Sequence, residues 1–148
     1  MSSPQGASAG MRITLPLPGR GCSPNHHGHW RTRATATKAH RTAACLACKA
    51  ALPAGWRPVP VRISAEFYCG PNLGRAKLYR PLDTANAIGS LKACVDGLVD
   101  AGLTPSDSHQ WISWGDVRLL RRKAEHGGRC CVVVTIAPQP ADGAEGAR

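Results

Sequence analysis

The sequence predicts one small α/β domain, in which a mixed sheet is packed by two helices in the order β-α-β-α-β-β. The chain has 148 residues, enough for a single hydrophobic core but not for two. Its hydrophobic fraction is 43%, which favours a packed domain over a disordered chain. Segments that alternate in polarity are separated by segments with helical spacing of apolar residues. We expect the domain to span 11–137, between disordered tails at 1–10 and 138–148.

The first half of the chain predicts two strands around a helix. Arg12–Leu17 alternates in polarity and ends in prolines, as a strand would. A loop rich in Gly, Pro and His follows, up to Trp30. Thr35–Leu52 contains many Ala and Lys residues and neither Gly nor Pro, so we expect a helix that stops at Pro53. Val59–Cys69 alternates β-branched and polar residues and predicts the second strand.

The second half predicts a helix and two further strands. Gly70–Leu82 is a basic loop, and Asp83–Ala101 carries apolar residues at helical spacing. Trp111–Leu120 and Cys130–Ile136 have the character of strands. We expect Arg121–Arg129 to form a basic hairpin between those two strands.

The charge balance points to a polyanionic partner. Lys and Arg total 19 against nine acidic residues, which gives a formal net charge of +10. Such a surplus accelerates encounter with nucleic acid, whose phosphates supply affinity independent of sequence. A basic protein with no nucleic-acid function is the alternative. We find neither a membrane-length apolar run nor a signal pattern, so a cytoplasmic protein with reduced thiols is expected, of bacterial or phage origin.

Acidic residues are scarce, and four of the nine fall in one short segment: Asp83, Asp96, Asp100 and Asp107. Asp83 stands where the second helix should begin, and Asp107 stands in the loop after it. Phosphodiester cleavage needs an activated water and a stabilised leaving oxygen, and Mg²⁺ held by one or two carboxylates can supply both. The alternative is structural, with Asp83 as a helix N-cap and Asp107 as a turn residue.

The segment 83–107, DTANAIGSLKACVDGLVDAGLTPSD, resembles the signature of the RusA-type Holliday junction resolvases. That signature has an Asp-x-Asp-Asn group, a helical Lys, an Asp-Ala/Gly-Leu group, a Gly and an acidic pair. The matching positions are Asp83, Asn86, Lys92, Asp96–Leu98, Ala101–Gly102 and Asp107. The opening Ile13–Pro16, followed by Ser23–Asn25 and a basic stretch, is similar to the first strand and loop of that family. The resemblance covers roughly residues 11–137.

Three departures separate the chain from the family pattern. Ala85 stands where the second Asp of the first group belongs. Three extra residues separate Asn86 from Lys92, relative to the shortest family pattern. Ser106 replaces the first member of the acidic pair, so only two of the three expected metal-binding aspartates are clear.

The resemblance implies a magnesium-dependent endonuclease that binds and resolves four-way DNA junctions in recombination and repair. Asp83 and Asp107 would hold Mg²⁺, for which Mn²⁺ could substitute, and Asp96 is a further candidate ligand. Lys92 would approach the scissile phosphate, although an ion pair with Asp96, four residues on, is the structural alternative. Asn86 would shape the start of the helix beside the site.

The resemblance also implies binding of branched DNA by a homodimer. A four-way junction is two-fold symmetric in its open form, so paired cutting suits a two-fold dimer. The candidate phosphate contacts are Arg31, Arg33, Arg75, Lys77 and Arg80.

Two other functions remain open at this stage. Ala85 and Ser106 would favour a DNA-binding relative with an impaired or lost metal site. A zinc-stapled nucleic-acid-binding module without catalysis is a further alternative. Its candidate ligands are Cys22, His26, His27, His29, His40, Cys45 and Cys48.

Overall fold

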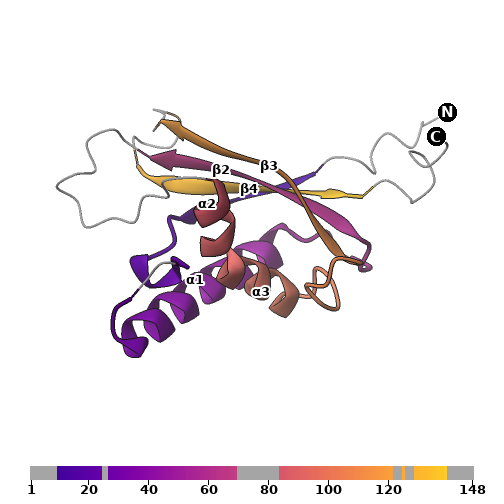
Figure 1. The fold of residues 1–148 in the computed structure, drawn as a ribbon. Coiled ribbons are helices and arrows are strands. Elements are labelled where there is room, and N and C mark those ends of the chain that lie inside the picture. Colours follow the sequence, from indigo (N-terminus) through magenta and orange to yellow (C-terminus); the bar gives the residue numbers. More distant parts are fainter. Residues whose placement is uncertain (1–9, 25–26, 70–83, 122–124, 126–128, 140–148) are drawn as a thin grey trace, which may run out of the picture.

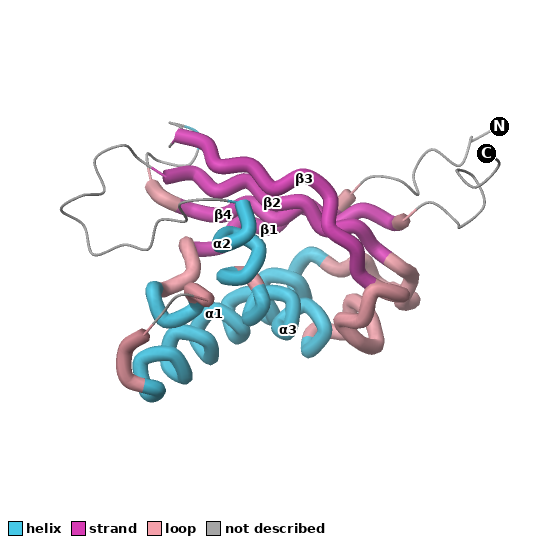
Figure 2. The backbone as a smooth tube through the Cα atoms, in the orientation of Figure 1, coloured by secondary structure: helices cyan, strands magenta, loops and turns pink. Residues whose placement is uncertain are grey.

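The computed structural model describes residues 10–24, 27–69, 84–121, 125 and 129–139. These residues form two layers, a four-stranded sheet and a layer of helices that lies against one of its faces (Figure 1). In the backbone trace the strands and the helices separate cleanly into these layers (Figure 2). The prediction of a small α/β domain with a mixed sheet is therefore confirmed. Of the tails predicted at 1–10 and 138–148, residues 1–9 and 140–148 lie outside the described residues. Pro138 still belongs to β4, and the Gln139 N–H donates to the Pro60 carbonyl oxygen at 2.9 Å.

The sheet has the strand order β1-β4-β2-β3. β4 (Cys131–Pro138) runs antiparallel to β1 (Met11–Pro16) and to β2 (Val61–Cys69), whereas β3 (Ile112–Arg121) pairs with β2 in parallel. All four strands were predicted within a few residues of these bounds. The predicted hairpin between β3 and β4 is wrong, because β2 lies between them. The end of β3 and the start of β4 lie on either side of the end of β2.

The first helix, α1 (Trp30–Ala51), begins five residues earlier than Thr35, where the sequence predicted it. His29 caps its N-terminus, since the imidazole Nδ1 accepts a hydrogen bond from the backbone N–H of Arg31 at 3.1 Å. The buried residues His40, Ala44 and Cys48 recur every four positions, so one narrow stripe of the helix faces the core. The helix packs along α3 and against β1.

The second helix is broken, where the sequence predicted one continuous helix. α2 (Thr84–Ser90) and α3 (Lys92–Asp100) are separated at Leu91, which lies at φ −92° and ψ 5°. The buried Ser90 hydroxyl donates to the Ala87 carbonyl oxygen at 2.7 Å and satisfies an acceptor near the break. Because of this break, Lys92 begins a new helix instead of lying in the middle of an old one.

The core lies between the sheet and the helices, and strand alternation explains it. On β2, Val61, Ile63, Ala65 and Phe67 are almost fully buried against the helices, as Ile13 and Leu15 are on β1. The alternate residues face the opposite side, where Tyr68, Cys131 and Val133 form a smaller apolar cluster. In the part of the chain that the structure describes, no helix has both the length and the apolar character needed to cross a bilayer.

Candidate functional site

The loop that carries Asp107 starts from a tight helix ending. Gly102 follows α3 at φ 92°, a conformation that glycine adopts without steric cost. The Leu103 N–H donates to the Leu98 carbonyl oxygen at 3.1 Å, and the Gly102 N–H donates to the Val99 carbonyl oxygen at 2.9 Å. These two bonds satisfy carbonyl groups that the end of a helix otherwise leaves open. The chain then turns back alongside α3.

Hydrogen bonds fix the rest of this loop. The indole Nε1 of Trp56 donates to the Leu103 carbonyl oxygen at 3.0 Å, across 47 residues of sequence. The Thr104 hydroxyl donates to the Ser106 carbonyl oxygen at 2.9 Å, and the Ser106 hydroxyl bonds to that of Ser108 at 3.1 Å. Trp56 was not among the predicted site residues, because its contact is long-range and leaves no spacing pattern. Asp107 is thus held between anchored neighbours.

Lys92 joins the two acidic side chains that the resemblance singles out in this region. Its ammonium group donates to Asp96 Oδ1 at 2.8 Å and to Asp107 Oδ2. The two hydrogen bonds, first that to Asp107, raise the pKa of Lys92. The same ammonium group lowers the pKa of Asp107. We call Lys92, Asp96 and Asp107 the α3 cluster; it includes the Lys92–Asp96 ion pair that was the structural alternative.

The α3 cluster is open to solvent and locally negative. The Lys92 side chain is 65% exposed and that of Asp107 is 44% exposed, so a ligand could reach both. One ammonium and two carboxylates carry a net charge of −1 in a chain of net charge +10. Two carboxylates that converge on a single cation are a hard-oxygen donor set of the kind that Mg²⁺ accepts. The donor set therefore fits Mg²⁺, provided that the exposed ammonium group swings aside.

The start of α2 is described only in part. Asp83, the other predicted metal ligand, lies outside the described residues, directly before the first residue of α2. Ala85 is exposed in the first turn, and Asn86 is half-buried beside it. Asp100 does not join the cluster, because its carboxylate binds the Arg41 guanidinium with two bonds of 2.6 and 2.8 Å. That pair lowers the pKa of Asp100 and fastens α3 to α1.

The N-terminal loop lies against α2. Pro24 packs so closely on Gly89 that a side chain at residue 89 would overlap with the proline ring. Arg33 donates to the Ser23 carbonyl oxygen at 3.3 Å and ties this loop to α1. Arg31 and Arg33 are both exposed at the start of α1, on the helix that follows this loop. The other predicted phosphate contacts, Arg75, Lys77 and Arg80, lie outside the described residues.

The candidate zinc ligands do not gather within the described residues. There, no group of three or more His, Cys, Asp or Glu side chains is placed to share a metal ion. Cys45 and Cys48 lie on α1, and Cys48 is fully buried in the main core, where burial raises the pKa of its thiol to about 11. His29 already caps α1. His26 lies outside the described residues.

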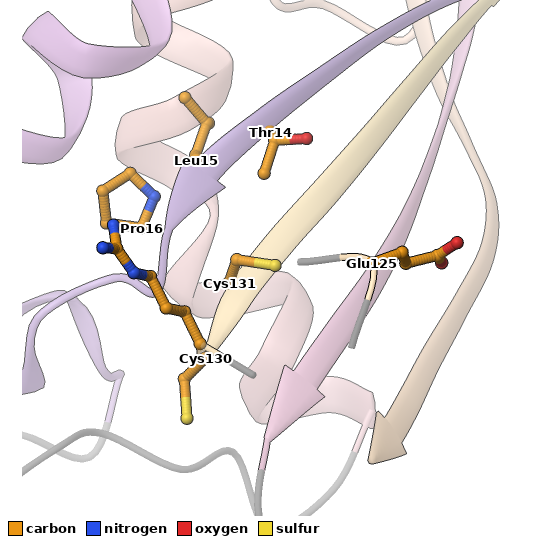
Figure 3. Close-up of a pocket in the computed structure, with 7 residues that line it drawn as sticks. Thr14, Leu15, Pro16, Glu125, Cys130 and Cys131 are labelled. Atoms are coloured by element: carbon orange, nitrogen blue, oxygen red, sulfur yellow. The ribbon is translucent and has the colours of Figure 1, made fainter. Parts of the chain in front are cut away.

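A pocket of about 570 Å³ lies elsewhere, where β1 ends and β4 begins. It is lined by Thr14, Leu15, Pro16, Glu125, Arg129, Cys130 and Cys131. In Figure 3, Leu15 and Pro16 lie at the end of β1 and Cys131 lies at the start of β4. Thr14 and Cys131 alternate with core residues, so they lie on the sheet face away from the helices. The pocket shares no residue with the α3 cluster.

Comparison with known protein families and with curated proteins gives no match for this sequence.

Proposed function

We propose that this protein is a magnesium-dependent endonuclease of branched DNA, of the RusA type, that acts on four-way junctions. The observation that carries the proposal is the α3 cluster. Lys92 and Asp107 both match the nuclease signature and lie 15 positions apart in the sequence. In the structure they form an ion pair on an open surface. The sequence motif alone did not require that contact. The presence of this contact supports the view that Lys92 and Asp107 belong to one site and do not have two unrelated structural roles.

Each residue of the cluster has a distinct role in this proposal. Asp107, with Asp96 and Asp83, would hold Mg²⁺, which activates a water and stabilises the leaving oxygen when it is bound. Lys92 would release its carboxylates as the metal binds and turn its ammonium group toward the scissile phosphate. There it would stabilise the charge that develops on the phosphate oxygens. A lysine side chain is protonated at neutral pH at its ordinary pKa, so Lys92 keeps its positive charge after it leaves the two carboxylates.

The partner is DNA recognised mainly through its backbone. The net charge of +10 and the exposed Arg31 and Arg33 favour phosphate contacts, which position DNA without reading its sequence. A homodimer would present two such sites to the two-fold symmetric junction. Light scattering at micromolar concentration should give the mass of a dimer, and a monomer mass would contradict paired cutting.

A strand-cleavage assay on a synthetic four-way junction tests the catalytic part of the proposal. Asp107→Asn and Asp83→Asn keep side-chain size but remove charge, so each should lower the cleavage rate by more than about 100-fold. Junction binding should persist or tighten, because a negative charge near phosphate is removed. Asp116→Asn changes an exposed carboxylate on β3 outside the cluster, and it should leave the rate within a few-fold. Cleavage that survives the loss of both Asp83 and Asp107 would exclude the site.

A gel-shift series tests the DNA-binding part separately. Affinity for the junction should exceed that for a duplex of equal length and fall steeply with salt, since counterions are released on binding. Equal affinity for both DNA forms at moderate salt would indicate a general DNA-binding protein.

An inactive DNA-binding relative is the second candidate, and two observations favour it. Ala85 presents no oxygen ligand, and the Ser106 hydroxyl is engaged by Ser108 within the loop. This candidate predicts junction binding with no cleavage by the unmodified protein in either Mg²⁺ or Mn²⁺.

A further inference from the structure

Trp30, the first residue of α1, is an unusually exposed aromatic residue. It is 67% exposed, more than any other large hydrophobic side chain of the described residues. The other three tryptophans, Trp56, Trp111 and Trp114, are partly buried and pack against the main core. An exposed indole offers a large apolar surface with one polar N–H, on which a partner can be bound.

Cationic and aromatic groups surround the Trp30 ring. The His29 imidazole stacks on it, with ring centroids 5.6 Å apart and an interplanar angle of 29°. The Arg31 guanidinium carbon lies 5.4 Å from the ring centroid, within the range of a cation–π interaction. The neighbouring Arg33 and Lys38 are exposed on the same helix. An apolar protein partner would have to desolvate these charges, whereas a nucleic acid would neutralise them.

Trp30 begins the helix that follows a loop packed on α2. The loop before α1 packs on α2 through the contact of Pro24 with Gly89, and the Arg33 bond to Ser23 ties α1 to the same loop. α2 carries Asn86 and leads, across the break at Leu91, to Lys92. α2 thus connects the loop before α1 with the helix that carries Lys92.

We propose that Trp30, with His29 and Arg31, is a stacking platform for an unpaired base of single-stranded DNA. Base stacking needs accessible indole surface, which the 67% exposed Trp30 retains beside His29 and Arg31, and a guanidinium can hold the adjoining phosphate. The proposal depends on the ring and not on the amide groups at the start of α1. It extends the proposed function by naming the DNA form that this surface binds, because a branched substrate offers unpaired bases where its arms meet.

Fluorescence anisotropy with a labelled short oligothymidylate tests the platform, with an abasic strand of the same length and charge as the second probe. The unmodified protein should bind the oligothymidylate more tightly than the abasic strand. Trp30→Ala should weaken oligothymidylate binding by about 5- to 100-fold and abolish the preference, whereas Trp30→Phe should retain most of it.

Leu46→Ala is the matched control. Leu46 is 63% exposed and lies on the same helix, about 24 Å along its axis from Trp30. Its removal should change neither affinity. Equal binding of the two probes by the unmodified protein, or equal losses in Trp30→Ala and Leu46→Ala, would overturn the platform.

The outcome is separable from that of the proposed function. A Trp30-dependent preference for bases in a protein that never cleaves junctions would retain the platform and exclude the nuclease. Junction cleavage that depends on Asp107 but not on Trp30, together with equal binding of the two probes, would retain the nuclease and exclude the platform.

Discussion

Lys92 and Asp107 are joined by an ion pair between the first turn of α3 and the loop that precedes β3. Asp96 shares the same ammonium group from one helical turn further along α3. Lys92 thereby occupies the point at which the two carboxylates meet. If those carboxylates bind a divalent cation, lysine and metal compete for them, and this competition can be measured.

The first prediction follows from that competition. Lys92→Gln removes the ammonium group but keeps a side chain of comparable size, so two carboxylates are left unneutralised. Calorimetry should show tighter Mn²⁺ binding than in the unmodified protein, while cleavage of the junction falls. Lys38→Gln, at an exposed position of α1, should change neither quantity. Unchanged Mn²⁺ affinity in Lys92→Gln would show that the α3 cluster is a structural ion pair and not a metal site.

The second prediction concerns the departure at Ala85. This residue is exposed in α2, so Ala85→Asp adds a carboxylate without burying charge. If the metal site lacks a ligand, the substitution should raise the cleavage rate, and more in Mg²⁺ than in Mn²⁺, since Mn²⁺ should depend less on a complete ligand set. If Asp96 already serves as the third ligand, the rate should stay the same or fall. Ala85→Asn adds a similar side chain without the charge and should not raise the rate.

The third prediction concerns the contact between α1 and α3. A methyl group at Gly97 would overlap with the Arg41 carbonyl oxygen and lie 2.9 Å from the Ala44 Cβ, so the helices would have to move apart. Gly97→Ala should therefore lower the free energy of unfolding by about 1–3 kcal/mol, despite the higher helix propensity of alanine. Urea denaturation measures this change. Ala39→Gly, at an exposed position of α1, gives the intrinsic difference of roughly 1 kcal/mol for comparison. A stabilised Gly97→Ala protein would contradict the close approach.

The fourth prediction is a pH dependence due to His40. This side chain is only 5% exposed, and within the described structure its Nε2 atom has no hydrogen-bond partner. Burial lowers its pKa from 6.5 to about 4. Between pH 6.5 and about 4 the unfolded chain therefore binds a proton at His40 that the folded protein does not.

The folded state should accordingly lose stability as the pH falls from 6.5 to 4, by up to about 3 kcal/mol from this residue. Urea denaturation across this range should show a shallower loss in His40→Leu than in the unmodified protein. The difference between the two slopes isolates His40, because every carboxylate is common to both proteins. Identical slopes would show that the imidazole is protonated as readily in the folded protein as in the unfolded chain.

Local sequence patterns predicted the elements of this fold but not the way in which they pair. The alternation of apolar and polar residues located β1 and β2. The helical spacing of apolar residues located the segment from Thr84 to Asp100. The insertion of β4 between β1 and β2 depends on long-range pairing, which alternation does not encode, so the hairpin prediction failed. The break at Leu91 was equally hidden, because apolar spacing continues through it.

In the candidate site too, local sequence predicted the residues but not the contacts between them. The motif identified Lys92 and Asp107 through the order of residue types along the chain. Their meeting depends on the turn at Gly102 and on the distant Trp56, which holds Leu103. Only the folded chain brings these contributions together.

The strand order also constrains when the protein can fold during its synthesis. Of the four described strands, β4 leaves the ribosome last, yet it forms the only described partnership of β1 and one of the two of β2. A nascent chain that ends before Cys131 leaves β1 without its described partner and the sheet incomplete, so cooperative folding must wait until β4 has emerged. Until that moment, the apolar faces of β1 and β2 stay available to chaperones and to other nascent chains.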